Sequence, residues 1–293
     1  PQYSRAQLST WLKNGLITID GQHLKPKEKI QTQAIIEFSD NCLTTLAENQ
    51  LFLPQAIPLN IIYEDESLLI INKPAGLVVH PGAGNKDNTL LNALLHHAPQ
   101  LHDLPRAGII HRLDKDTTGL LVIAKTLTAY TNLARQMQAR EIKRNYMTLV
   151  QGHVIAGGII DTHYGRHPHN RLKMAVCMGG RQAITHYRVN KHYQGYLTSL
   201  SVTLETGRTH QIRVHMQHIN HPVFGDPLYG KHPKLPTDLP QNIQNHLLSF
   251  NRQALHASTL TLTHPEQATI LTFSADLPND LQTILTILDN YLA

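Results

Sequence analysis

The sequence predicts an α+β protein in which a large domain is built on a mixed, largely antiparallel sheet and a small α/β unit precedes it. Two observations indicate this fold class. From Ile61 onward, short apolar runs of strand length are separated by Gly and Pro and only occasionally by helical patterns, which does not suit a regular βαβ winding. The 293 residues also suffice for one large and one small domain.

Changes in composition divide the chain into three predicted parts. Residues 1–38 form a compact basic unit, and residues 39–57 form a polar, slightly acidic linker with a proline near its end. Residues 58–293 form the main domain, and no internal repeat is visible.

Strands in the main domain are predicted by continuous apolar runs and by alternation. Residues 67–72 (SLLIIN) and 119–124 (GLLVIA) have the length and composition of strands that are buried on both faces. The pair Ile109 and Ile110 indicates a further buried strand before the second run. Two more segments alternate at the period of a strand, Tyr146, Thr148 and Val150 in one and Leu200, Val202 and Leu204 in the other.

Helices are predicted where apolar residues recur three or four positions apart. Three segments show this pattern: 89–96, 128–139, and the segment marked by Ile212, Met216 and Ile219. Two segments rich in Pro, Gly or Asn predict a turn and a surface loop, respectively 73–76 (KPAG) and 231–243.

Composition argues against several classes of protein. Cys42 and Cys177 form no CxxC pair, so we expect neither a zinc knuckle nor a disulfide framework and favour a reducing cytoplasm. There is no apolar run of about 18 residues and no basic stretch followed by an apolar one, which argues against a spanning helix or a signal peptide. We therefore expect a cytoplasmic protein with no membrane partner.

Positive charge is concentrated in one part of the chain. The net charge of +5 and the isoelectric point near 9.2 are only a weak indication of nucleic-acid binding. Between Asp161 and Glu205 there is no acidic residue, whereas there are five histidines and six Lys or Arg residues. Such a stretch suits the neutralisation of RNA phosphates, but a solvated basic face explains it equally well.

A polar segment at 111–119 (HRLDKDTTG) separates the apolar pair at 109–110 from the predicted strand that follows. The purely structural interpretation is a turn, in which Asp114 or Asp116 caps the turn and the threonines bond to loop backbone groups. The alternative is a loop kept polar for chemistry, and spacing alone does not decide between the two.

Together with the residues after it, this segment (HRLDKDTTGLLVIAK) resembles the signature of the large-ribosomal-subunit branch of the pseudouridine synthases. Three further segments agree with that family in order: NKPAG at 72–76, KRNY at 143–146 and GRTHQIRVH at 207–215. Three more resemble the D-type 23S rRNA members of the branch: PGAGN at 81–85, DPLYG at 226–230 and RQALHA at 252–257. The resemblance covers nearly the whole chain and implies a pseudouridine synthase fold for the main domain.

The resemblance also implies roles for single residues. Asp114 matches the catalytic aspartate, and Arg213 matches the arginine that pairs with it. Tyr146 matches the tyrosine that stacks on a flipped base, and Arg112 the residue that fills the space the base leaves. The alternatives are an ordinary half-buried strand tyrosine for Tyr146, a surface phosphate contact or a solvated arginine for Arg112, and a surface helix arginine for Arg213. The RNA contacts expected in this domain are Arg112, His111 and Arg208.

The chemistry of the reaction suits these residue types. Conversion of uridine to pseudouridine detaches the base at N1 and rejoins it at C5, and a carboxylate can serve as the nucleophile at either C1′ of the sugar or C6 of the base. Because the base must leave its stack, an aromatic surface is needed to hold it. The sequence has no Walker loop and no dinucleotide fingerprint, and we expect no cofactor, no nucleotide and no metal.

The same resemblance implies the partner. We expect 23S ribosomal RNA, either free or in large-subunit precursor particles, with the stem-loop called helix 69 as the target and the enzyme acting as a monomer.

Residues 4–21 (SRAQLSTWLKNGLITIDG) resemble an S4 RNA-binding module that lacks its first helix. The pattern is a helix, a turn at Gly15, a short strand and a turn at Gly21, followed by a lysine-rich loop. The resemblance implies RNA contacts by five basic residues, Arg5, Lys13, Lys25, Lys27 and Lys29. The alternative is a nonspecific basic hairpin.

Two other functions compete with this interpretation. A metal hydrolase is suggested by the 20 histidines, of which His210, His215, His218 and His221 crowd one segment, but the segment lacks an HExxH pattern. A noncatalytic RNA-binding or ribosome-assembly factor on the same scaffold is the second rival. The complete set of Asp114, Tyr146 and Arg213 argues against it.

Overall fold

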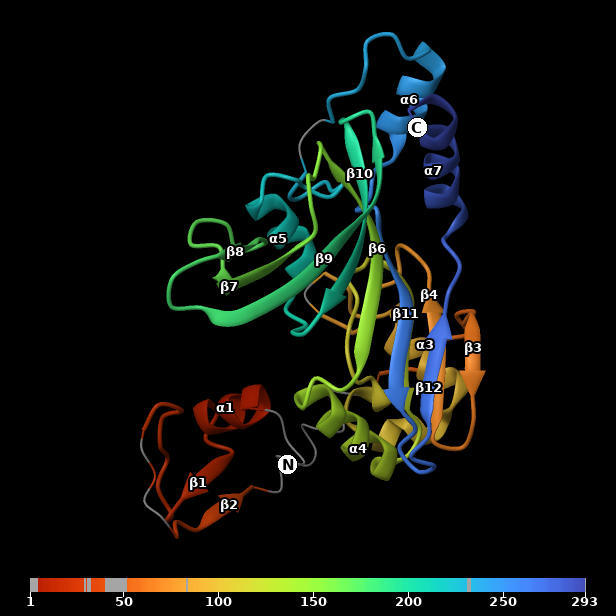
Figure 1. Ribbon diagram of the computed structural model, residues 1–293. Coiled ribbons are helices and arrows are strands. Elements are labelled where there is room, and N and C mark those ends of the chain that lie inside the picture. Colours follow the sequence, from red (N-terminus) through yellow and green to blue (C-terminus); the bar gives the residue numbers. More distant parts are fainter. Residues whose placement is uncertain are drawn as a thin grey trace. The chain divides into compact units, whose positions relative to one another are not determined.

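The computed structural model describes residues 5–28, 30, 33–39, 52–82, 84–230 and 233–292. The chain divides into two compact units, Pro1–Leu53 and Pro54–Ala293. Each unit has its own core, and each is described separately below. Figure 1 shows the elements of both.

The N-terminal unit is small. Its elements are α1 (Arg5–Lys13), β1 (Ile17–Ile19) and β2 (Ile36–Phe38), and the two strands pair antiparallel. Trp11, Ile17 and Ile19 form its buried core. Gly15 and Gly21 have φ values of 70° and 72°, so the turns lie where the sequence predicts them. The order of elements follows the expectation, while the likeness to an S4 module stays a prediction.

The larger unit is an α+β domain on a mixed sheet, as predicted. In the described residues the sheet has ten strands, in the order β3-β4-β5-β11-β6-β10-β9-β7-β8, with β12 paired to β11 beside this path (Figure 1). The strand β5 pairs parallel with β11, and the other named pairs are antiparallel. The strands are β3 (Ile61–Glu64), β4 (Leu68–Lys73), β5 (Thr118–Ala124), β6 (Lys143–Gln151), β7 (Gly158–Arg166), β8 (Met174–Val176), β9 (Arg181–Tyr193), β10 (Leu197–Leu204), β11 (Leu255–Thr263) and β12 (Ile270–Ser274).

Helices accompany the sheet. They are α3 (Leu90–His97), α4 (Leu127–Gln138), α5 (Gln211–His218), α6 (Gln241–Ser249) and α7 (Asn279–Tyr291), with short 3-10 helices η1 (Pro99–Asp103) and η2 (Pro105–Gly108). The helix α4 begins after Thr126, whose hydroxyl accepts the Ala129 N–H at 3.1 Å. No helix in the described part of the chain is both long enough and apolar enough to span a bilayer.

The predicted apolar runs are the most buried strands of the sheet. Every residue of β5 is buried, and all of β4 except Asn72. Alternate residues of the two strands, including Ile70 and Val122, form one cluster with Ala129 and Leu133 of α4. Burial on both faces explains why these strands read as continuous apolar runs.

The pair Ile109 and Ile110 does not form the predicted strand. Ile109 makes only an isolated bridge to Ile123, because η2 turns the chain sharply just before it. At Gly108, φ is 75° and an added Cβ would lie 1.9 Å from the carbonyl oxygen of Ala124, so only glycine fits this turn. The predicted loop at 231–243 is also too long, since α6 begins at Gln241.

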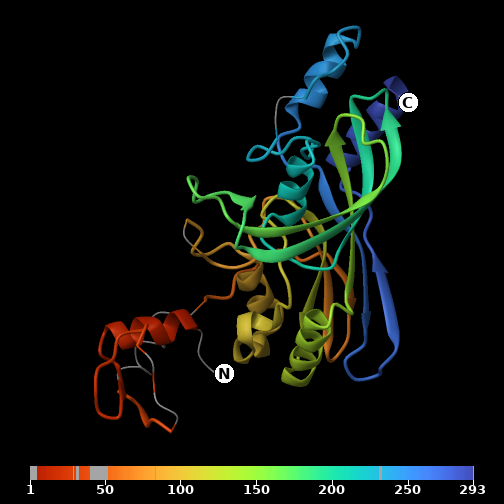
Figure 2. The same cartoon turned by 60° about the vertical axis from the view of Figure 1, so that its left-hand side comes forward.

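The basic stretch between residues 161 and 205 folds as β7, β8, β9 and the following β10. Figures 1 and 2 show the strands β7 to β9 extending beside α5. Tyr164 of β7 and Ala183 of β9 pack against Val214 of α5 and Tyr229. The six Lys and Arg side chains are exposed or half-buried, so their charges stay accessible.

Candidate active site

The polar segment predicted to carry chemistry forms the loop that enters β5, and side chains from distant parts of the chain hold it in place. Thr117 closes a turn by donating its N–H to the Asp114 carbonyl at 3.1 Å. Three further bonds come from elsewhere: Lys73 Nζ to the Lys115 carbonyl (2.8 Å), Arg252 Nη1 to the Asp116 carbonyl (3.2 Å) and Gln253 Nε2 to Thr117 Oγ1 (3.0 Å). The loop is therefore fixed from the end of β4 and from the start of β11.

Lys73 is fully buried beneath this loop. Its ammonium also donates to the carbonyl oxygens of Pro74 at 2.7 Å and Leu77 at 3.0 Å. Burial lowers the pKa of Lys73 to about 7, against the opposing charges of Asp116 and Asp114. The NKPAG motif thus contributes a lysine that supports the loop from below.

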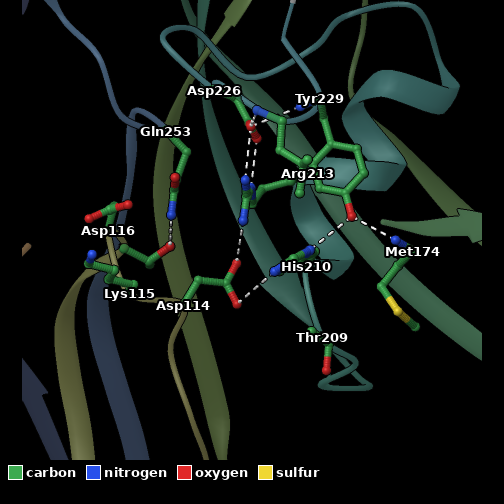
Figure 3. Close-up of polar contacts among 12 residues, drawn as sticks. Asp114, Lys115, Asp116, Met174, Thr209, His210, Arg213, Asp226, Tyr229 and Gln253 are labelled. Carbon is green, nitrogen blue, oxygen red and sulfur yellow. Dashed lines mark hydrogen bonds and ion pairs between the residues drawn. The ribbon is translucent and has the colours of Figure 1, made fainter. Parts of the chain in front are cut away.

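Asp114 and Arg213, which lie 99 residues apart, meet in the structure. Arg213 Nη1 donates to Asp114 Oδ2 at 3.1 Å (Figure 3). The Asp114 side chain keeps 16% of its surface exposed, whereas Arg213 is only 5% exposed. Arg213 is therefore not the surface arginine that its position on the helix alone suggests. It donates through one nitrogen of its guanidinium to a carboxylate that solvent can still reach.

A second carboxylate, Asp226, holds the other side of Arg213. Its Oδ2 accepts Arg213 Nε at 2.6 Å and its Oδ1 accepts Nη2 at 2.9 Å. The backbone N–H groups of Leu228 and Tyr229 also donate to Oδ1. Burial alone would raise the pKa of Asp226, but the hydrogen bonds and charge of Arg213 outweigh it, and the pKa lies below its usual value. Arg213 is thereby locked in one orientation (Figure 3).

His210 faces the second oxygen of Asp114. Its Nε2 lies 3.9 Å from Asp114 Oδ1, and its Nδ1 lies 2.8 Å from the Tyr229 hydroxyl (Figure 3). Burial lowers the pKa of His210, which favours the neutral imidazole. The Tyr229 oxygen also accepts the Met174 N–H at 2.8 Å. When Tyr229 donates its O–H to Nδ1, the imidazole proton lies on Nε2, the nitrogen that faces Asp114.

Tyr146 lies on β6 and is 5% exposed. Burial raises its pKa, and the negative charge of Asp114 contributes in the same direction. A neutral, buried phenol ring near the carboxylate can provide an apolar surface for a planar ligand. Its predicted role in stacking stays a prediction.

The predicted RNA contacts of this unit gather at one cavity of about 700 Å³, which is lined by Arg112, His111 and Arg208 among others. Arg112 is exposed, and Arg208 Nε donates to the Gln182 carbonyl at 3.5 Å. His111 is turned inward, since its Nε2 accepts the Val122 N–H at 3.4 Å. Burial, aided by the charge of Arg144, lowers the pKa of His111 to about 3, so this side chain is neutral at physiological pH.

The basic residues predicted in the N-terminal unit are only partly described. Lys13, Lys25 and Lys27 are exposed, as solvent-facing contacts must be. The Arg5 side chain and Lys29 lie outside the described residues.

The four crowded histidines do not converge. His210 faces Asp114, and His218 is exposed. His215 is bonded to Thr162 and Thr185, and His221 bonds to the Gln151 carbonyl. Among the described residues, no three His, Cys, Asp or Glu side chains are gathered as a metal ion would require.

Sequence reasoning missed the residues that support the site. Asp226, Tyr229 and Arg252 belong to the motifs DPLYG and RQALHA, which carried the resemblance without a role being assigned to them. The carboxylate that pairs with Arg213 from behind could not be located from local spacing. Arg144 belongs to the motif KRNY and was likewise passed over.

Comparisons with known proteins identify the family of the chain. The profile of the RNA pseudouridylate synthase family matches residues 67–218. The ribosomal large subunit pseudouridine synthase D of Xanthomonas campestris is 47% identical over 98% of this chain and 86% of its own length. The protein of the same name from Escherichia coli K12 is 47% identical over 98% of this chain and 87% of its own.

Solved structures give the same result. Human RNA pseudouridylate synthase domain containing 4 matches with a TM-score of 0.62 and 25% identity, over 78% of this chain and 93% of that one. Human RNA pseudouridylate synthase domain containing 1 matches with a TM-score of 0.59 and 25% identity, over 80% and 89%.

Proposed function

Because the chain belongs to the RNA pseudouridylate synthase family, an isomerase family that acts on RNA, we propose that it converts uridine to pseudouridine in the RNA of the large ribosomal subunit. The substrate follows the names of the two bacterial relatives, which match almost the entire chain. We propose helix 69 of 23S RNA as the target stem-loop, the cytoplasm as the place of reaction and a monomer as the active form.

The observation that carries the proposal is the arrangement of Asp114, Arg213 and Asp226. The Asp114 carboxylate has one oxygen held by the Arg213 guanidinium and is still partly exposed to solvent. A carboxylate in this state is a positioned nucleophile. The guanidinium is itself held from behind by a buried carboxylate, so its direction does not depend on the substrate. We assign Asp114 as the attacking group.

The reaction rearranges one nucleotide without a net change in its atoms. The N1–C1′ bond breaks, the detached base turns, and a C5–C1′ bond forms. The proton on C5 is then lost and N1 carries a proton in the product. Asp114 forms a transient bond either to C1′ or to C6, and Arg213 stabilises the carboxylate whenever it is released.

The base must be flipped out of its helix before this can happen. We assign Tyr146 as the ring against which the flipped uracil lies, and Arg112, two residues before Asp114, as the side chain that occupies the vacated space. Both assignments rest on the resemblance and on the place of these residues around Asp114.

The experiment that tests the function is release of tritium from RNA that carries 5-tritiated uridine. The purified chain should release tritium from a helix 69 stem-loop, and pseudouridine should appear in that RNA. A stem-loop of scrambled loop sequence is the matched control for target choice. Release from neither RNA, nor from full-length 23S RNA, would contradict the proposed function.

We propose that the N-terminal unit adds affinity for RNA. Removal of residues 1–38 takes away five basic side chains, while every proposed catalytic residue remains. Binding of the target stem-loop should weaken and its dependence on salt should become shallower, since fewer counterions are released. Equal affinity and equal salt dependence for the full and shortened chains would refute this role.

A further inference from the structure

Arg144 is a buried arginine whose charge has no counterpart. It is 6% exposed, and its Nε is buried without a hydrogen-bond partner. Among the residues that the structure describes, no carboxylate forms an ion pair with it. A buried guanidinium left in this state is costly, and an anion bound beside it would reduce that cost.

The cavity beside Arg144 is strongly positive. Its volume is about 700 Å³, and its lining includes four further arginines and one carboxylate: Arg106, Arg112, Arg140, Arg208 and Glu205. Glu205 is already taken, because its two oxygens accept His186 Nε2 at 2.6 Å and Arg140 Nη1 at 2.7 Å. The positive charge of Arg144 is therefore not balanced from within the cavity.

The remaining titratable groups of the lining add no negative charge. His80 and His111 both line the cavity. Burial and the charges of Arg106 and Arg112 lower the pKa of His80 to about 4, and the pKa of His111 is about 3. Both are neutral near pH 7 and can donate or accept hydrogen bonds there.

The cavity also adjoins the proposed active site along the chain. Arg144 and Tyr146 are two residues apart on β6 and are both buried, so their side chains lie on the same face of the strand. Arg112 precedes Asp114 by two residues, and Arg208 precedes His210 by two. Gly207 leaves room for the guanidinium, because an added Cβ would lie 2.5 Å from Arg144 Nη1.

We propose that this cavity binds a backbone phosphate of the substrate RNA, with Arg144 as the buried anchor and Arg106, Arg112 and Arg208 around it. The proposal rests on the proposed function and adds to it a phosphate subsite next to the base-holding Tyr146. A phosphodiester supplies the single negative charge and the several acceptor oxygens that an unpaired guanidinium needs. The bound phosphate would thus neutralise the positive charge of Arg144, which no carboxylate of the cavity neutralises.

The test compares Arg144→Met with Arg135→Met, which removes an equal charge from an exposed position of α4 that does not line the cavity. Arg144→Met should raise the Kd for the target stem-loop about tenfold, as expected for one lost contact to a charged group. It should also reduce the slope of log Kd against log salt concentration by about 1. Gly207→Ala, which keeps the charge but displaces the guanidinium, should weaken binding in the same direction by a smaller factor.

A second measurement does not depend on RNA. Inorganic phosphate should raise the Tm of the wild type above that in chloride of equal ionic strength, and should not do so for Arg144→Met. An unchanged Kd and salt slope for Arg144→Met would overturn the RNA phosphate subsite, whatever inorganic phosphate does. Absence of tritium release by the wild type would instead refute the proposed function, and the phosphate-dependent Tm would still report on the anion site.

Discussion

Arg213 and Arg144 are buried to nearly the same extent, 5% and 6% exposed, yet their surroundings differ completely. Arg213 is hydrogen-bonded to two carboxylates, Asp114 and Asp226. Arg144 lies in a cavity whose one carboxylate is already engaged by other side chains. Of these two arginines, Arg213 has its partners within the protein, whereas Arg144 has no carboxylate partner among the described residues.

The contrast separates two uses of the same side chain. A guanidinium that must orient a catalytic group has to be fixed before the substrate arrives, and internal carboxylates can do this. A guanidinium that must bind an anion has to stay unpaired until the anion arrives, because an internal carboxylate would compete with it. Burial is shared by both, so burial alone does not reveal which use an arginine has.

The largest expected effect comes from removing the carboxylate that Arg213 orients. Asp114→Asn should reduce isomerisation by more than about 10³-fold, because the amide is a poor nucleophile. RNA affinity should change little, since it depends mainly on phosphate contacts. Single-turnover tritium release and filter binding measure the two quantities. Substantial turnover, after deamidation has been excluded by mass spectrometry, would remove Asp114 from the mechanism.

Stability should distinguish the two arginines directly. Arg213→Met leaves Asp226 buried without its counterion and should lower the free energy of unfolding by about 3–5 kcal/mol. Arg144→Met removes an unpaired buried charge and should leave the free energy of unfolding equal or raise it, by less than about 1 kcal/mol. Urea denaturation followed by circular dichroism gives both values. Similar losses for the two variants would mean that Arg144 is a structural residue.

Geometry at Arg213 should matter as well as charge. Arg213→Lys keeps one positive charge, but an ammonium cannot bond Asp226 through two nitrogens and reach Asp114 as well. The catalytic rate should fall on the order of 10²-fold. Arg135→Lys, on an exposed helix face, is the matched control for the same exchange. A rate close to that of the wild type would show that a positive charge at this position is sufficient for catalysis and that the shape of the guanidinium is not required.

The smallest effect concerns acid stability. Because Arg213 holds the pKa of Asp226 below its usual value, the unfolded chain binds this proton more readily than the folded one. The contribution of Asp226 to stability is present above the unfolded pKa of about 3.9 and is lost as the pH falls through the lower folded pKa. The difference in free energy of unfolding between wild type and Asp226→Asn should be constant above about pH 5 and shrink below about pH 4. A difference that does not change with pH would contradict the ionised pair.

The sequence predicted the parts of the fold that have a clear periodic pattern. β4, β5 and α4 are buried elements with continuous or helical apolar runs, and each lies within one or two residues of its predicted position. β3 and β12 were not predicted individually, and all of their residues are exposed or half-buried. The strand expected at Ile109 was wrong, because left-handed conformations at Arg106 and Ala107 turn the chain there.

For the site, the sequence motifs identified Asp114 and Arg213, which the structure brings together, but not what holds them. The partner of Arg213, Asp226, lies 13 residues further along the chain on a loop with no helical relation to it. Arg144 is unpaired because no carboxylate of the described residues lies close enough to form an ion pair with it. A local sequence pattern does not show which distant carboxylates lie near a residue. Contacts between distant segments come from the tertiary fold.

The bonds that fix the Asp114 loop join segments that are synthesised far apart in time. Arg252 and Gln253 bond to Asp116 and Thr117 across 136 residues of chain, and β5 pairs parallel with β11 at the same place. Gly119, with φ of 112°, has the backbone of Ala257 where a Cβ would lie. A nascent chain that has emerged from the ribosome only as far as β10 contains Asp114 and Lys73, but it lacks Arg213, Arg252 and Gln253. The loop can therefore take its full set of bonds only after translation has passed β11, and its completion is a late, long-range step of folding.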